Sequence, residues 1–204
     1  MKTTLVTLTA LVGLAVAATA APQTFDFKDP KGVNNAVFKL DAPLESINGS
    51  ASGVSGTVTF DPANPGATTG KIVVDAASLN VPNAMMKEHM HKADWMDVAN
   101  HKEITFEAKS LKNVKTEGDK TSADATGTFT MRGVSKEITV PVTLTYLKDK
   151  LAARMPGQKG DLLVIRANFT VKRADYGINP KAPADKVSDT IDLTLSIAGS
   201  APQK

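Results

Sequence analysis

Apolar and polar residues alternate along most of this chain. In segment 138–146, Ile, Val, Val, Leu and Tyr occupy every second position, with Thr, Pro, Thr and Thr between them. Alternation with a period of two is typical of a β-strand that buries one face. The same alternation recurs in segments 54–60, 104–108, 125–131, 163–171 and 187–197, and shorter runs at 25–27 and 35–41 can form two further strands. Turn-forming residues separate the strands at 61–66, 117–119, 132–133 and 156–160.

One stretch, residues 83–96, has helical periodicity instead. Within it, Met86, Met90 and Ala93 fall on one side of a helix. Asn83 is suited to the N-cap position, because its side-chain oxygen can accept a hydrogen bond from a free backbone N–H of the first turn. The pattern predicts a single helix over this stretch, inserted between two strands.

Together these segments predict an all-β fold of about eight strands with one inserted helix, in a single domain over residues 21–204. Long antiparallel strands that are apolar on one face either pair as two sheets or close into a barrel. The alternation alone does not separate these two architectures. A barrel of about eight strands has just enough interior to hold one small ligand.

The N-terminus has the layout of a secretory signal peptide. Lys2 supplies a positive charge, residues 5–18 form an uncharged run, and Ala18 and Ala20 place small residues around a cleavage site. A membrane-spanning helix would need about 20 strongly apolar residues, and this run is shorter. We expect a signal peptide over residues 1–20, cleavage after Ala20, and a periplasmic or secreted protein that is not inserted in a membrane.

Charge and cysteine content narrow the function classes. The chain has 24 Lys and Arg against 21 Asp and Glu, a net charge of +3, and its lysines are scattered. Nucleic-acid-binding domains usually gather their basic residues on one face, so we expect no nucleic-acid partner. The sequence contains no cysteine, so an exported domain of this composition must be held together by its core rather than by disulfides.

Four segments carry recognisable motifs: SGTVTFDP at 55–62, KEHMHKADWMDVANHKEITFEAKSL at 87–111, GTFTMRGVSKEITVPVTL at 127–144 and RADYGINPKAPADKVSDTIDLTLSIAG at 173–199. Together they resemble the signature of the YceI-like lipid-binding family. The likeness keeps the family's order and spacing over most of residues 53–199. Two departures stand out: Lys87 and Glu88 replace an Arg-Asp pair, and the N-terminal strand pair lacks the His-Ser that the family often shows.

The resemblance implies a lipocalin-like antiparallel β-barrel that carries a polyisoprenoid, a quinone or another long-chain lipid in an internal tunnel. It implies binding rather than catalysis, so we expect a protein that is not an enzyme, with a lipid as its ligand and no resident cofactor. A homodimer of such barrels is compatible with the sequence.

Apolar side chains on the strand faces and the helix are the candidates to line the tunnel. The candidate lipid-binding residues are Phe60, Met86, Met90, Trp95, Phe106, Phe129, Met131, Ile165 and Phe169. Each buried methylene contributes about 0.8 kcal/mol, so a tunnel of this kind needs no polar chemistry for useful affinity. The helix methionines add a soft surface that adapts to an irregular chain. The alternative is that the same residues fill a solid core.

Three polar residues are candidates for a mouth that contacts a headgroup: Lys87, His89 and Arg173. Two of them have a simpler alternative. Lys87 can be a solvated helix residue, and Arg173 can pair with Asp175 near a turn.

The main alternative function is a periplasmic Cu(I)-binding protein. The chain's three histidines, His89, His91 and His101, lie near Met85, Met86, Met90 and Met96 in the sequence. Thioethers and imidazoles suit Cu(I). However, His89 and His91 are two residues apart, so on a helix they face different directions and do not easily share one ion.

Signals for other classes are weaker. There is no Gly-x-Ser-x-Gly elbow of a serine hydrolase and no glycine-rich phosphate loop. An interaction module that uses a sheet edge rests only on Pro141, since proline inside a strand usually marks an edge.

Overall fold

The computed structural model describes residues 21–203, so the predicted signal peptide and its cleavage site lie outside the described residues. The strands are β1 (Gln23–Asp26), β2 (Asn35–Asp41), β3 (Ser46–Ala51), β4 (Val54–Phe60), β5 (Thr69–Asp75), β6 (Glu103–Glu117), β7 (Lys120–Met131), β8 (Val134–Leu147), β9 (Gly160–Lys172) and β10 (Thr190–Pro202). The helical elements are η1 (Pro65–Ala67), η2 (Ala76–Ser78), α1 (Ala84–His91), α2 (Leu151–Arg154) and η3 (Ala174–Tyr176). None of the described helices is long and apolar enough to span a bilayer.

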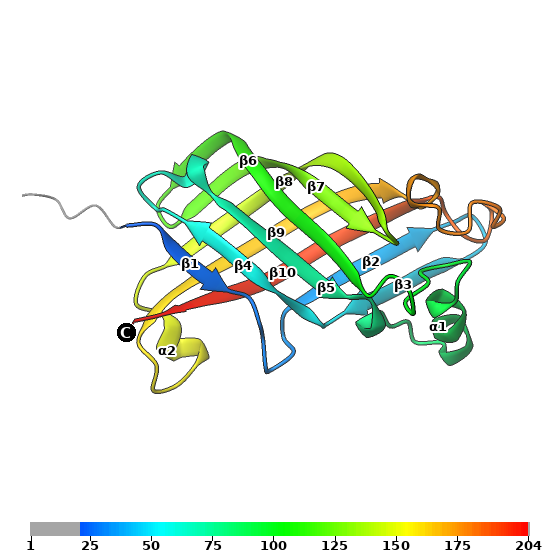
Figure 1. Ribbon diagram of the computed structural model, residues 1–204, viewed down its shortest axis with the longest axis horizontal. Helices are drawn as coiled ribbons and strands as arrows, with labels where there is room; N and C mark the ends of the chain where they lie inside the picture. The colour runs from blue at the N-terminus through cyan, green and yellow to red at the C-terminus, as the bar shows by residue number, and fades with distance from the viewer. Residues whose placement is uncertain (1–20, 204) are drawn as a thin grey trace, which may run out of the picture.

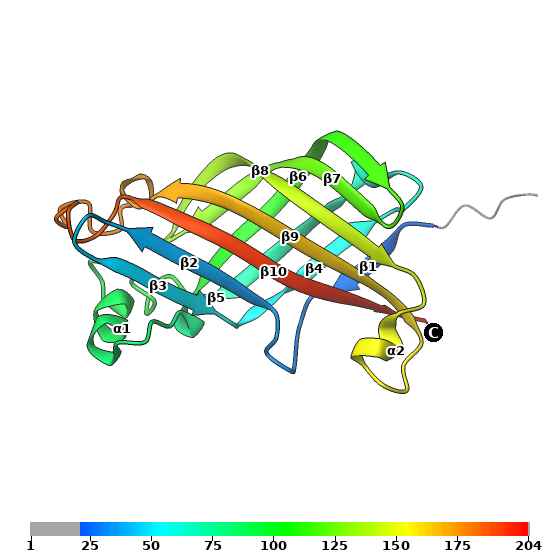
Figure 2. The ribbon, with the colours of Figure 1, turned by 180° about the vertical axis from the view of Figure 1, so that it is seen from behind.

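The strands form one closed antiparallel barrel (Figures 1 and 2). Their hydrogen-bonded order is β1-β4-β5-β6-β7-β8-β9-β10-β2-β3, and a β1–β10 pairing closes the ring. β10 pairs with β2 over residues 192–196 and with β1 at Ser200, so β1 and β2 are two halves of one long strand. β3 and β4 are the matching halves of the next strand. The result is an eight-stranded barrel, which confirms the predicted all-β fold and decides for a barrel over a sandwich.

Pro141 lies on the part of β8 that pairs with a neighbouring strand on one side only, as expected for an edge position. It lies in β8, opposite Asp124 of β7, and the β8–β9 ladder begins one residue later at Val142. The proline therefore sits at the end of one ladder inside the closed barrel, where a missing N–H is tolerated.

Strand β7 shows how alternate residues build the interior. Every second residue from Thr121 to Met131 is buried, and three of these, Ala123, Ala125 and Gly127, are small. A Cβ on Gly127 would lie 2.3 Å from the backbone oxygen of Glu107, so glycine allows close approach of β6. Small inward residues keep space open in the middle of the barrel.

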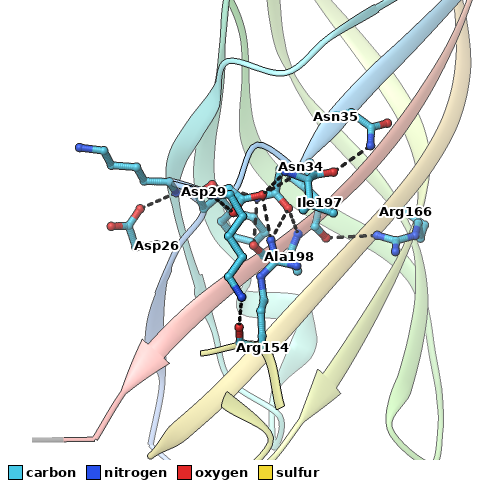
Figure 3. A network of polar contacts seen from close by, with 12 residues as sticks. Asp26, Asp29, Asn34, Asn35, Arg154, Arg166, Ile197 and Ala198 are labelled. Carbon is cyan, nitrogen blue, oxygen red and sulfur yellow. Dashed lines mark hydrogen bonds and ion pairs between the residues drawn. The ribbon is translucent and has the colours of Figure 1, made fainter. Parts of the chain in front are cut away.

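The break between β1 and β2 is bridged by a buried asparagine (Figure 3). The Asn34 side-chain amide donates to the carbonyl oxygens of Phe27 and Ala198, each at 3.0 Å, and its oxygen accepts from the Ala198 N–H at 2.9 Å. The amide thus replaces the backbone bonds that β10 lacks where the strand is interrupted. Asp29 accepts from the Asn34 N–H at 2.7 Å, and Arg154 of the α2 turn contacts Asp29 at 3.1 Å. The network ties the broken strand to both β10 and α2.

Replacing Asn34 with alanine is expected to destabilise the fold by about 1–3 kcal/mol, because it leaves buried backbone groups of β10 without partners. Urea denaturation gives the free energy of unfolding. The matched control is Asn35→Ala, since the Asn35 amide makes only an exposed hydrogen bond to the Val33 carbonyl. An equal loss in both variants would contradict the bridging role.

The end of the barrel that carries α2 is filled by aromatic and polar side chains. Phe25 is fully buried and Phe60 is 2% exposed, and their rings lie 6.3 and 5.9 Å from that of Tyr146. The Tyr146 hydroxyl donates to Asp161 at 2.7 Å, and the Gln23 amide donates to the same carboxylate at 2.9 Å. Burial, followed by this bond to Asp161, raises the pKa of Tyr146 to about 12. We term this end, where Phe25, Phe60 and Tyr146 pack together and hydrogen bonds hold Tyr146, the packed floor of the barrel.

Acid is expected to weaken both networks. Burial raises the pKa of Asp29 and of Asp161, but hydrogen bonds to the carboxylates outweigh it and leave each pKa below its ordinary value of 3.8. A depressed folded-state pKa stabilises the fold above the unfolded-state pKa, and this contribution is lost as the pH falls through the folded-state pKa. The free energy of unfolding should therefore fall below about pH 4. Urea titrations across this range should show a shallower fall in Asp161→Asn than in Asp192→Asn, a control at an exposed position of β10; equal slopes would contradict the assignment.

Candidate functional site

A cavity of about 420 Å³, which we term the outer chamber, lies at the end of the barrel that carries α1. This is the end opposite α2 (Figure 1). Strands β2, β3 and β10 supply apolar walls, among them Phe38, Leu40, Ile47, Ile191 and Leu193. The α1 side contributes Met85, Met86, His89, Met90, Trp95 and Met96.

Helix α1 is shorter than the sequence predicted. Asn83 is its N-cap, as expected, and its side-chain oxygen accepts from the Met86 N–H at 2.9 Å. The prediction that the helix continues to Met96 is wrong, because the backbone at Lys92 is extended and the helix ends at His91. The chain turns back there, and the Met96 N–H donates to the Met90 carbonyl at 2.9 Å. This turn brings Trp95 and Met96 to the chamber wall beside the helix.

A second cavity of about 150 Å³, the inner chamber, lies within the barrel. It shares the lining residues Phe38, Leu79, Ile104, Met131 and Leu193 with the outer chamber, so the two chambers adjoin. Its lining contains no ionisable side chain. Small residues make room for it: Ala36, Ala51, Gly70, Ala108, Ala125 and Ala167.

The structure brings most of the predicted site residues to these chambers. Phe106, Phe129, Met131, Ile165 and Phe169 line the inner chamber. Met86, Met90, Trp95, His89 and Arg173 line the outer chamber. Their role in binding stays a prediction.

Two predicted residues lie elsewhere. Phe60 lines neither chamber, because it belongs to the packed floor against Tyr146. Lys87 also lines neither chamber, although its neighbours on α1 do. We therefore leave both out of the proposed site.

Several lining residues escaped the sequence reasoning. Phe38 and Leu40 of β2 alternate with polar residues, as do Ile191, Leu193 and Leu195 of β10. This alternation showed which face they occupy but not how far along the barrel axis they lie. The small residues of the inner chamber carried no signal, since alanine fits either face of a strand.

Arg173 is the buried cation of the outer chamber. It is 2% exposed, and its guanidinium donates to the carbonyl oxygens of Ile178, Asn179 and Ser188. The guanidinium carbon lies 5.9 Å from the centre of the Trp95 ring. Burial lowers the pKa of Arg173, and the charge of the Asp189 carboxylate partly opposes this.

The expected alternative, a pairing of Arg173 with Asp175, is wrong. Asp175 instead forms an ion pair with Lys136 at 2.9 Å. Arg173 has no ion pair within 4.0 Å among residues 21–203.

The three histidines occupy separate environments. His89 lines the outer chamber, and the His91 ring nitrogen lies 2.9 Å from the Leu79 carbonyl oxygen. His101 lies 3.8 Å from the Asp97 carboxylate. Within the part of the chain that the structure describes, no three His, Cys, Asp or Glu side chains form a metal-binding group. The three histidines are thus apart from one another, while His89 lines the outer chamber together with Met85, Met86 and Met90.

Comparisons with known proteins agree with this architecture. A sequence profile for the YceI-like domain matches residues 16–198. A UPF0312 protein of Pseudomonas paraeruginosa is 32% identical over 149 residues, which cover 71% of this chain and 69% of the relative. The crystal structure of Burkholderia cenocepacia BcnA superposes with a TM-score of 0.65 at 20% identity, covering 81% of this chain and 95% of BcnA. A polyisoprenoid binding domain from Saccharophagus degradans, implicated in plant cell wall breakdown, superposes with a TM-score of 0.63 at 13% identity, covering 89% of this chain and all of that domain (100%).

Proposed function

Since this chain belongs to the YceI-like domain family, we propose that it is an exported carrier that holds one long-chain apolar lipid, such as a polyisoprenoid or a quinone, in its two chambers. The observation that carries the proposal is the pair of adjoining apolar chambers inside the barrel. Ligand cavities in proteins typically measure about 300–1,000 Å³, and the outer chamber alone reaches that range. The similarity to a polyisoprenoid binding domain supports the same ligand class.

The two ends of the barrel suggest how a lipid is held. The packed floor of Phe25, Phe60 and Tyr146 fills the α2 end, and the outer chamber lies at the α1 end. A long chain would therefore enter past α1 and place its tail in the inner chamber, whose walls are free of charge. Each methylene removed from water adds about 0.8 kcal/mol, against the cost of ordering the lipid. Binding of this kind requires no catalytic group, and we assign none.

Trp95 provides a direct test, because it is the only tryptophan of the chain and it lines the outer chamber. Delipidated protein is titrated with a long-chain bromoalkane, whose bromine quenches tryptophan fluorescence at short range. We expect saturable quenching at one bromoalkane per barrel, with no quenching by a short-chain bromoalkane at the same concentration. Quenching that never saturates, or that ignores chain length, would count against a lipid-sized cavity.

A further inference from the structure

The outer chamber contains a buried charge that an apolar lipid does not explain. Three ionisable residues line it, Glu45, His89 and Arg173, and of these Glu45 and His89 are exposed. Arg173 is 2% exposed. Arginine remains protonated in proteins, so this wall of the chamber carries a permanent positive charge.

No acid forms an ion pair with this guanidinium within 4.0 Å among residues 21–203. Asp175 pairs with Lys136 at 2.9 Å, and Glu45 is exposed. The Asp189 carboxylate, which accepts from the Ala174 N–H at 2.8 Å, only partly opposes the effect of burial on the Arg173 pKa. The guanidinium instead meets neutral carbonyl oxygens through Nε and Nη1. A buried charge without a counterion is unfavourable unless something else supplies the opposite charge.

One guanidinium nitrogen remains free for a ligand. Nη2 of Arg173 makes no hydrogen bond to residues 21–203. It is also not one of the fully buried polar atoms without a partner in that part of the chain, so it stays accessible. Arg173 lines the outer chamber, so a ligand in that space lies beside this side chain. Three carbonyls and the Trp95 ring hold the guanidinium plane in place, so its free edge is preorganised.

Resting on the proposed function, we infer that Arg173 selects long-chain lipids with an anionic headgroup, a carboxylate or a phosphate, over neutral lipids of the same length. An anionic oxygen at Nη2 forms a charge-assisted hydrogen bond and supplies a counterion in direct contact with the guanidinium. The tail then follows the shared wall at Met131 and Leu193 into the inner chamber. A neutral headgroup leaves the charge uncompensated.

The test uses ligands that differ only in the headgroup. Trp95 fluorescence of the wild-type chain, quenched by a neutral long-chain bromoalkane, is restored by competition with hexadecanoic acid, hexadecyl phosphate, hexadecanol or methyl hexadecanoate at neutral pH. We expect the acid and the alkyl phosphate to bind at least about 10-fold more tightly than the alcohol and the ester. Acetate and inorganic phosphate should not compete, because they lack the chain.

Two variants of Arg173 test whether this residue causes the preference for anionic headgroups. Arg173→Lys keeps the charge but loses the planar fork, and Arg173→Met removes the charge; both should reduce the ratio of hexadecanoic acid affinity to hexadecanol affinity. The matched control is Lys87→Met, which removes a cation from α1 that lines neither chamber and should leave the preference intact. If Arg173→Met fails to fold, the headgroup series on the wild-type chain and the Arg173→Lys variant still test whether Arg173 selects anionic headgroups.

The possible results separate the two claims. If the bromoalkane does not bind, the proposed carrier function fails. If it binds, and acid, alcohol and ester then compete equally, the carrier stands and the anion preference is overturned. Competition by acetate, or an unchanged acid preference in Arg173→Met, would also overturn the role of Arg173.

Discussion

Replacing Phe169 with glutamate is expected to weaken binding of a neutral long-chain lipid by at least about 100-fold. Phe169 lines the inner chamber, whose walls carry no ionisable group. A bound alkyl chain would remove water from a carboxylate at this position, at a cost of several kcal/mol. A loss of about 2.7 kcal/mol in binding free energy already corresponds to a 100-fold loss of affinity. Quenching of Trp95 by the long-chain bromoalkane measures the change.

The control for this variant is Phe169→Leu, which keeps the wall apolar and should change the affinity only modestly. The Phe169 ring also packs edge-on against that of Phe129 at 5.9 Å, so circular dichroism must show that the glutamate variant is folded. A folded Phe169→Glu protein that binds the bromoalkane as well as the wild type would place the lipid outside the inner chamber.

Replacing Phe60 with alanine is expected to lower the free energy of unfolding by about 3–5 kcal/mol while leaving lipid affinity nearly unchanged. Phe60 is 2% exposed and belongs to the packed floor, where its loss leaves a cavity beside Tyr146. Urea denaturation and the bromoalkane titration, run on the same preparation, separate the two effects.

The comparison variant is Phe106→Ala. Phe106 is only partly buried and lines the inner chamber, so it should lose less stability than Phe60→Ala and more lipid affinity. The assignment of Phe60 to the floor would be contradicted if its alanine variant kept its stability and lost the ligand.

Phe60 and Phe169 also show what the alternation of the sequence could and could not predict. Both sit at apolar positions of alternating strands, and both point into the barrel. Alternation reports the face of a strand, because side chains change sides at every residue. The level along the barrel axis depends on strand register instead. Phe60 lies opposite Gln23, at the floor, while Phe169 lies opposite Leu193, a residue shared by the two chambers.

Local sequence patterns also could not predict that the strands close into a barrel. Closure depends on the pairing of β1 with β10 and on the side chain of Asn34, which bridges a broken strand. Asparagine in a loop is ordinary in a sequence, so its burial carried no signal. The alternating strands and the Asn83 cap were predictable because local geometry determines them.

Arg173 illustrates the same limit for the site. The sequence named it as a candidate for the mouth, with a local ion pair to Asp175 as the alternative, but gave no sign that it is buried. The structure folds residues 178, 179 and 188 over the guanidinium, and those contacts depend on how the segment between β9 and β10 closes over the barrel. Only the three-dimensional arrangement reveals a buried cation facing the chamber.

The measurement that tests the central claim most directly is native mass spectrometry of the chain after export from its own host, before and after organic extraction. The account predicts a polypeptide that begins at Ala21 and carries one lipid of several hundred daltons, released by the solvent and taken up again by the extracted protein. A protein that carries no such mass, and that binds no long-chain lipid after extraction, would show that the chambers do not serve as a carrier site.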